Sequence, residues 1–101
     1  MRVLLDFEFP LEPFNSMVKN GTAGQKIEQA VGDIKPEAVY FTARNGKRGG
    51  TMVVDLADAS KIPAIVEPLF LSFNASVQIH PCMTAEDLAK AGLDEMGKNY
   101  K

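Results

Sequence analysis

Two strand-like segments far apart in the chain, RVLLDFEF and ASVQIHPCM, alternate polar with apolar side chains. The polar positions on one side are Asp6 and Glu8 in the first segment, and Gln78, His80 and Cys82 in the second. If the two strands are antiparallel neighbours with their centres near residues 5 and 79, Asp6 lies beside Gln78 or His80. An aspartate orients a neighbouring imidazole and favours its charged form. We therefore predict that Asp6 and His80 form an acid/base pair.

Further candidate residues come from a hairpin in the middle of the chain and from the same two strands. Tyr40 or Arg44 can bind an oxyanion or a substrate carboxylate. Glu8 and Gln78 share the predicted face and are candidate binding residues. The alternative interpretation is structural: His80 is a partly buried strand residue that is hydrogen-bonded at an interface between two copies of the chain.

Other chemistry has weaker support in the sequence. Asp6, Glu8, His80 and Cys82 could chelate a metal, but residues alternating on adjacent strands match no specific ligand spacing, so we predict no metal and no cofactor. No basic residue is fixed beside Cys82 by spacing, and we expect a buried, inert thiol. The basic loop NGKRGG lacks the GxxxxGK[ST] pattern and joins two strands, so we expect a turn rather than a phosphate site.

The hairpin that carries Tyr40 and Arg44 is AVYFTARNGKRGGTMVVDL, residues 38 to 56. Asn45-Gly46 suits a type I′ turn, although the later Gly-Gly also allows a longer loop. The strand registers set by the two loop lengths differ by two residues. Such a shift does not exchange the faces of a strand, so the same residues lie on each face in both cases. One face is entirely apolar: Val39, Phe41, Ala43, Met52, Val54 and Leu56. The other face is mixed.

Two helical stretches are predicted before the hairpin. The first is short, begins around Pro13 and ends at the Asn-Gly pair of residues 20 and 21. Thr22 with Gln25 predicts a capping box that opens the second, which ends near residues 32 to 36. Its apolar stripe is Ile27, Ala30, Val31 and Ile34.

A further helix is predicted after the hairpin, with Asp58 or Ser60 as its cap. Its interior Pro68 removes a backbone hydrogen bond, so we expect a kink or an early break there. Its apolar stripe is Ile62, Ile65, Val66, Leu69, Phe70 and Phe73. These apolar stripes predict core packing.

A last strand and a tail helix complete the chain. Pro81 suggests that the strand of residues 75 to 83 is at a sheet edge or ends there. Thr84 with Asp87 predicts a capping box that opens the tail helix. The residues available for docking this helix are Leu88, Ala91, Gly92, Leu93 and Met96.

The predicted element order is βαββαβ with an extra C-terminal helix, which is typical of the ferredoxin-like α+β fold. We expect a single domain over residues 1–101. In this topology the helices pack on one face of a four-stranded antiparallel sheet, because the βαβ crossovers are right-handed. The all-apolar strand faces must then meet the helices, and the mixed face is best explained as a partly covered surface.

The segments EPFNSMVKNGTAGQKI, KPEAVYF and EPLFLSFNASVQI, together with the topology, resemble the dimeric α/β-barrel superfamily and a small bacterial family of unassigned function. Members of the superfamily, such as muconolactone isomerase and the antibiotic-biosynthesis monooxygenases, pair two ferredoxin-like protomers through their sheets. The resemblance implies a homodimer with a small-molecule cavity between sheet and helices or inside the barrel. Its haem-degrading members use a tryptophan, and this chain has none.

Composition narrows the class of partner. The net charge of −2 gives no reason to expect nucleic acid or an anionic membrane, and only Tyr40 offers an aromatic ring for RNA on the open face. No apolar run approaches the roughly 20 residues that span a bilayer. The single cysteine fits a reducing compartment, so we expect a cytoplasmic protein.

Two functions from different classes follow from these observations. The first is a small cofactor-independent enzyme, isomerase-like or monooxygenase-like, that acts on a small and partly apolar molecule. The second is a non-catalytic dimeric ligand-binding or sensor module whose mixed face is an interface. A solvent-open cavity lined by Asp6, Tyr40, Arg44 and His80 would favour the enzyme, whereas tight burial of these side chains against a second chain would favour the module.

Overall fold

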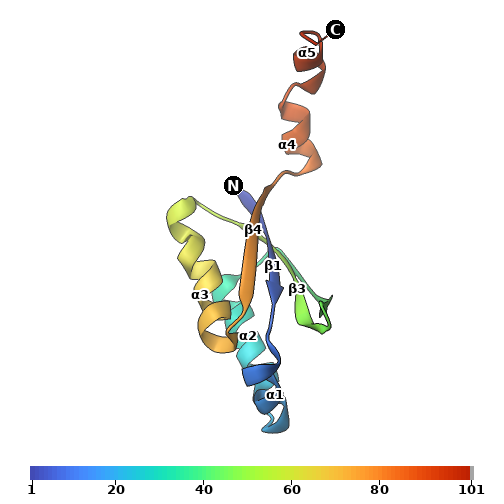
Figure 1. Ribbon diagram of the computed structural model, residues 1–101. Helices are drawn as coiled ribbons and strands as arrows, with labels where there is room; N and C mark the ends of the chain where they lie inside the picture. Colours follow the sequence, from blue (N-terminus) through green and yellow to red (C-terminus); the bar gives the residue numbers. More distant parts are fainter. Residues whose placement is uncertain (101) are drawn as a thin grey trace.

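The computed structural model describes residues 1–100 as a four-stranded antiparallel sheet with helices on one face and a helical tail (Figure 1). The elements in chain order are β1 (Arg2–Glu8), α1 (Leu11–Lys19), α2 (Ala23–Ile34), β2 (Ala38–Arg44), β3 (Lys47–Asp55), the 3-10 turn η1 (Ala59–Lys61), α3 (Ile62–Phe73), β4 (Ser76–Cys82), α4 (Ala85–Lys90) and α5 (Leu93–Gly97). The strand order is β2-β3-β1-β4. The predicted ferredoxin-like α+β fold is confirmed.

Strand β1 lies in the centre of the sheet and pairs antiparallel with both β3 and β4. Its odd-numbered residues Val3, Leu5 and Phe7 are almost completely buried against the helices. Its even-numbered residues are only half-buried and belong to the mixed face. The predicted division into an apolar and a mixed face is therefore confirmed for β1, and β4, which contains Pro81, is an edge strand as predicted. On edge strand β2 the helices do not cover the predicted apolar face, since Phe41 is 51% exposed and Ala43 is exposed as well.

The β2–β3 connection is the two-residue turn at Asn45 and Gly46. Both have positive φ angles, 52° and 73°, as a type I′ turn requires. Arg44 and Lys47 pair directly on either side of it. Of the two loop lengths that the sequence left open, the structure has the shorter, so β3 begins at Lys47 and includes the Gly-Gly pair.

Gly50 is required inside β3 because two neighbours occupy the space that a side chain would take. A Cβ atom built there would overlap the carbonyl oxygen of Tyr40 and lie 2.6 Å from Cζ of Phe7. The ring of Phe7 meets that of Phe41 edge-on, with a centroid separation of 5.9 Å. Gly50 thus allows the aromatic rings of the core to approach the backbone of the β2–β3 pair.

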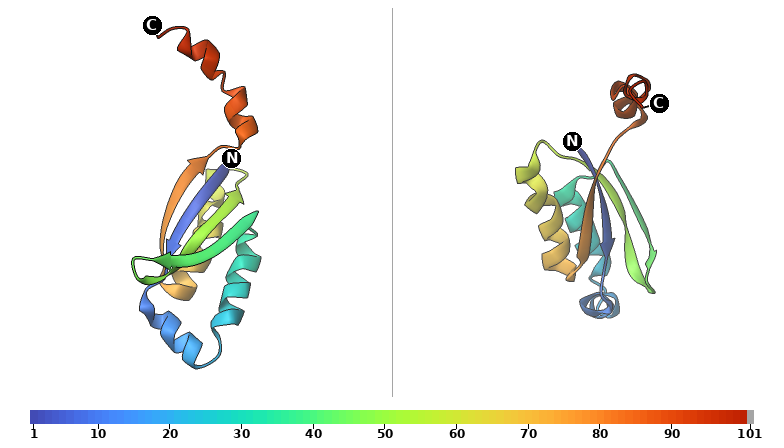
Figure 2. Two further views of the ribbon diagram at one scale, coloured as in Figure 1. Left: turned by 90° about the vertical axis from the view of Figure 1, so that its right-hand side faces the viewer. Right: turned by 45° about the horizontal axis from the view of Figure 1, so that its top comes forward.

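Helices α2 and α3 cover the apolar face of the sheet, and α1 lies at one end of it (Figures 1 and 2). The predicted stripes of both helices reach the core, although Phe70 stays 38% exposed. The buried core consists of Val3, Leu5, Phe7, Phe9, Phe14, Ala30, Ile34, Met52, Val54, Leu56, Ile65, Val66, Leu69, Phe73 and Ala75. Asp58, one of the two predicted caps, accepts a hydrogen bond from the backbone N–H of Ser60 and so caps η1 rather than α3 itself.

One local helix prediction is wrong, and one of the two outcomes expected at Pro68 does not occur. Thr22 makes no side-chain cap for α2, because its hydroxyl donates to the side chain of Asn20 at 2.6 Å. No early break occurs at Pro68, since α3 runs to Phe73. Buried residues of α3 lie on both sides of Pro68, and their packing against the sheet outweighs the lost backbone hydrogen bond.

The C-terminal tail begins with the predicted capping box. Thr84 and Asp87 exchange hydrogen bonds of 3.0 Å, and those from Thr84 lower the pKa of Asp87. The single predicted helix is instead two helices, because Gly92 adopts a positive φ of 73° between α4 and α5. Figures 1 and 2 show this tail extending away from the sheet. No helix within residues 1–100 is long and apolar enough to cross a membrane.

Gly50→Ala tests the close approach at β3. The added methyl group has no space, and we expect the free energy of unfolding to fall by about 1–3 kcal/mol. The matched control is Gly32→Ala in α2, where a Cβ meets nothing within 4 Å, so stability should rise by roughly 0.5–1 kcal/mol. Urea denaturation followed by circular dichroism measures both changes. Equal stability of the two variants would contradict this account.

Candidate functional site

Asp6 occupies the middle of the mixed sheet face because it lies on the central strand. It is directly opposite Thr51 of β3 on one side and Gln78 of β4 on the other. Side chains from three strands can therefore reach its carboxylate. The expected centres of the β1–β4 pair are confirmed, since Leu5 pairs with Ile79.

Arg44 and Thr51 hold one oxygen of the Asp6 carboxylate. Oδ1 of Asp6 accepts from Nη2 of Arg44 at 2.8 Å and from the Thr51 hydroxyl at 2.9 Å. The same Arg44 nitrogen lies 2.6 Å from the Thr51 hydroxyl oxygen, and its Nε donates to the Gly50 carbonyl at 3.3 Å. The side chains of Arg44 and Asp6 are 35% and 29% exposed, so the pair orients the carboxylate but adds only modest stability.

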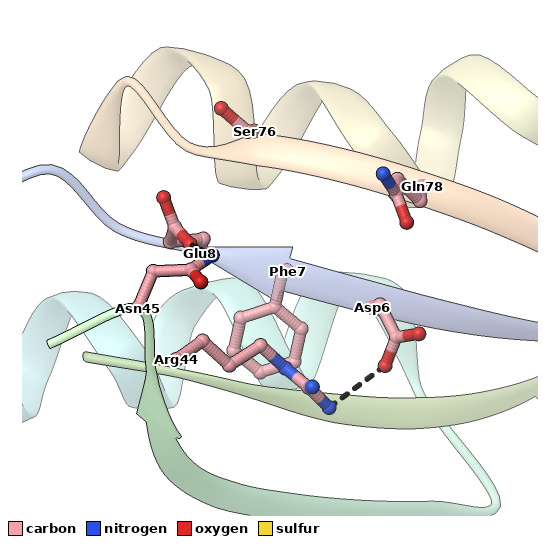
Figure 3. A pocket seen from close by; sticks show the side chains of 7 residues that line it. All are labelled: Asp6, Phe7, Glu8, Arg44, Asn45, Ser76 and Gln78. Carbon is pink, nitrogen blue, oxygen red and sulfur yellow. Dashed lines mark hydrogen bonds and ion pairs between the residues drawn. The ribbon is translucent and has the colours of Figure 1, made fainter. Parts of the chain in front are cut away.

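Gly49 clears the path that Arg44 takes across β3. A Cβ atom built on Gly49 would lie 3.2 Å from Cγ of Arg44 and 2.5 Å from the carbonyl oxygen of Phe7. The Arg44 side chain can therefore pass over β3 close to its backbone, and its guanidinium group reaches Asp6 on the next strand, β1. Figure 3 shows the Arg44 side chain extending toward Asp6, with the ion pair between them.

His80 lies beside the second oxygen of Asp6. It is directly opposite Leu4, and its Nε2 atom is 3.8 Å from Oδ2 of Asp6. Of the two partners left open for Asp6, Gln78 is its direct neighbour and His80 its diagonal neighbour. The His80 side chain is 55% exposed, so the imidazole is in contact with both the carboxylate and solvent.

Glu8 is the second carboxylate of this face and is also partnered. Its Oε1 atom accepts a 2.7 Å hydrogen bond from the amide of Asn45, and its Oε2 atom lies 3.7 Å from Nζ of Lys47. Both partners come from the hairpin turn. The type I′ turn thus determines the surroundings of Glu8 as well as the position of Arg44.

A hollow of about 340 Å³ lies over these residues (Figure 3). Its lining residues are Asp6, Phe7, Glu8, Arg44, Asn45, Ser76 and Gln78. Four of the six predicted site residues are therefore brought together. Tyr40 and His80 do not line the hollow: Tyr40 is 72% exposed on edge strand β2, and His80 lies beyond Asp6. The volume is within the range typical of small-ligand sites.

Sequence reasoning missed two polar residues of the hollow, Asn45 and Ser76. Ser76 is directly opposite Glu8, so the predicted strand pairing already contained the signal for it. Asn45 was considered only as a turn residue, and its side-chain contact with Glu8 depends on the twist of the hairpin.

The structure gives little support to one of the two cavity locations implied by the family resemblance. The space between sheet and helices measures only about 10 Å³ and is lined by core side chains. This is about the volume of a single water-sized probe, too small for an organic ligand. The apolar faces pack too closely for a cavity there.

The remaining candidates are less well placed for chemistry. Cys82 is partly exposed at the end of β4, so the prediction of a buried thiol is wrong. Its position after Pro81 at the sheet edge explains the exposure. Within residues 1–100, no group of three or more His, Cys, Asp and Glu side chains is arranged to hold a metal ion.

Comparison with known proteins agrees with the fold. No family model matches the chain, and no curated protein matches it. The solved structure of 5-chloro-2-hydroxyhydroquinone dehydrochlorinase from Burkholderia phenoliruptrix is similar, with 14% identity over 85% of this chain and 97% of that chain and a TM-score of 0.52. MupZ from Pseudomonas fluorescens shares 16% identity over 97% of this chain and 83% of that chain, with a TM-score of 0.42. At 14% identity the likeness to the dehydrochlorinase extends to the fold alone.

Proposed function

We propose that this protein binds a small molecule in the hollow on the mixed sheet face and catalyses a cofactor-independent, isomerase-like proton transfer. The observation that carries the proposal is the asymmetric environment of Asp6. Its Oδ1 atom is held by Arg44 and Thr51, whereas within residues 1–100 its Oδ2 atom accepts no hydrogen bond and lies 3.8 Å from Nε2 of His80. A carboxylate fixed at one oxygen and open at the other suits a general base.

The proposed reaction uses both members of the Asp6–His80 pair. Oδ2 of Asp6 takes a proton from a carbon beside a carbonyl group of the bound molecule and returns it to a different carbon, so the ligand keeps its composition. His80, which contacts both Asp6 and solvent, exchanges protons with the carboxylate between turnovers. Arg44 and Thr51 hold the carboxylate in position throughout.

The structural neighbour supports a small-molecule role without specifying a reaction. Its solved structure is a complex of a dehydrochlorinase with 2,5-dihydroxybenzoquinone, a ring-sized ligand. Because the same fold hosts many activities, the neighbour's chemistry is not transferred to this chain.

We also propose that two copies associate through their mixed faces, as in the dimeric α/β barrel. Figure 2 (left) shows this face of the sheet uncovered, with the helices behind it. It exposes Tyr40, and it also carries the half-buried apolar side chains Leu4 and Val53. Pairing two such faces would cover these apolar atoms and enclose the hollow.

A non-catalytic ligand-binding module is the second candidate. The observation that favours it is the placement of Tyr40 and His80, neither of which lines the hollow. In that case both side chains serve the dimer interface, and the hollow binds a ligand without turning it over.

Deuterium exchange tests the proton transfer with simple probe compounds in place of the natural substrate. Small cyclic ketones and unsaturated lactones are incubated with the protein in D2O, and loss of their proton signals is followed by NMR. We expect at least one compound to exchange faster than in buffer. Asp6→Asn and His80→Gln should each lower that rate by about 100-fold or more, because each removes a proton-transferring group.

The control for this experiment is Glu86→Gln, which removes one negative charge from the exposed tail. It should exchange at the wild-type rate. Compounds that bind in the hollow but never exchange above the buffer rate would eliminate catalysis and leave the binding module.

Sedimentation equilibrium tests the proposed dimer. Tyr40→Glu places a charge on the mixed face and should shift the protein from dimer to monomer, since pairing two such faces would bury that charge without a partner. The control is Leu71→Glu on α3, which is 80% exposed on the helical layer. A wild-type protein that is monomeric at all concentrations, or equal effects of the two variants, would refute the arrangement.

A further inference from the structure

Every charged side chain at the hollow already has a partner of opposite charge. Arg44 is bound to Asp6 at 2.8 Å, and Lys47 lies 3.7 Å from Glu8. Both carboxylates belong to the lining, together with the single guanidinium group of Arg44. The hollow therefore offers an anionic ligand no uncommitted cation, and it brings such a ligand close to two carboxylates.

The polar side chains of the hollow that have no partner among its lining residues are neutral. Figure 3 shows the side chains of Ser76 and Gln78 on β4 with no hydrogen bond to the other residues drawn. Gln78 is opposite Asp6, and Ser76 is opposite Glu8. These two residue pairs are about 7 Å apart along the strands. One ring with two hydroxyl groups could therefore contact Oδ2 of Asp6 in the first pair and the Ser76 hydroxyl in the second.

We propose that the hollow selects an uncharged, ring-sized molecule with at least two hydroxyl groups and rejects a carboxylate of the same size. This inference rests on the proposed small-molecule site and specifies its ligand class. It revises the expectation that Arg44 receives a substrate carboxylate, because Asp6 neutralises Arg44 in advance. In a two-fold dimer the second copy carries the same ion pairs, so its sheet face adds no unpaired positive charge to the hollow.

Asp6 is then the residue that sets the selectivity. Removing its charge while keeping its shape would release the guanidinium group of Arg44 for an incoming anion. The preference of the hollow should reverse in Asp6→Asn. Removing the guanidinium in Arg44→Gln should weaken binding of a carboxylate still further, because it leaves Asp6 and Glu8 beside the ligand.

The experiment compares resorcinol with 3-hydroxybenzoate, which has a carboxylate in place of one hydroxyl group. Each probe is titrated into 15N-labelled protein, and affinities are taken from the amide shifts of residues lining the hollow. We expect wild-type protein to bind resorcinol about tenfold or more tightly than 3-hydroxybenzoate. Asp6→Asn should reverse this order, and Glu86→Gln, which removes an equal charge from the tail, should keep it. If Asp6→Asn does not fold, Arg44→Gln still tests the prediction.

Three results would overturn the inference. Equal or tighter binding of 3-hydroxybenzoate by wild-type protein at the hollow would refute the ligand class and leave the small-molecule site intact. An unchanged preference in a folded Asp6→Asn variant would refute the role of Asp6. If neither probe shifts the residues of the hollow, the diol class is wrong, and failure of the cyclic ketones to shift them as well would also refute the proposed site.

Discussion

The antiparallel pairing of β1 with both β3 and β4 determines where every candidate residue lies. Side chains of a strand alternate between the two faces of the sheet. In this register the odd-numbered residues of β1 point into the core, and the even-numbered residues point to the mixed face. A slip of one residue would move Asp6 into the apolar core and Leu5 out of it. The burial of Leu5 and Phe7 against the helices therefore also fixes the position of the Asp6 carboxylate.

The site combines this central carboxylate with groups that the hairpin supplies. The two-residue turn brings Arg44 to the end of β2, and Gly49 leaves the space through which its side chain crosses β3 to Asp6. The resulting ion pair with Asp6 neutralises the positive charge of Arg44, which would otherwise attract an anion. The second oxygen of Asp6, 3.8 Å from His80, is the atom to which we assign the proposed proton transfer, and the exposed mixed face is the surface that the proposed dimer would cover.

Much of this arrangement could be predicted from the sequence because alternation and turn chemistry are local signals. They correctly gave the two faces of β1 and β3, the helical stripes and the β1–β4 register, whereas the predicted apolar face of edge strand β2 is exposed at Phe41. The failures came from tertiary effects: packing carries α3 through Pro68, and a side-chain contact with Asn20 displaces the predicted cap at Thr22. The Arg44–Asp6 pair was also missed, because the path of a long side chain over Gly49 depends on three strands at once.

The central claim is that the hollow over Asp6 is the functional site of this molecule. The most direct measurement is a map of backbone amide shifts as a mixture of uncharged ring-sized fragments is titrated into 15N-labelled protein. The account predicts that the largest shifts cluster at Glu8, Arg44, Asn45, Ser76 and Gln78, with smaller ones along the rest of the mixed face. Shifts confined to the helical layer or to the tail would contradict it.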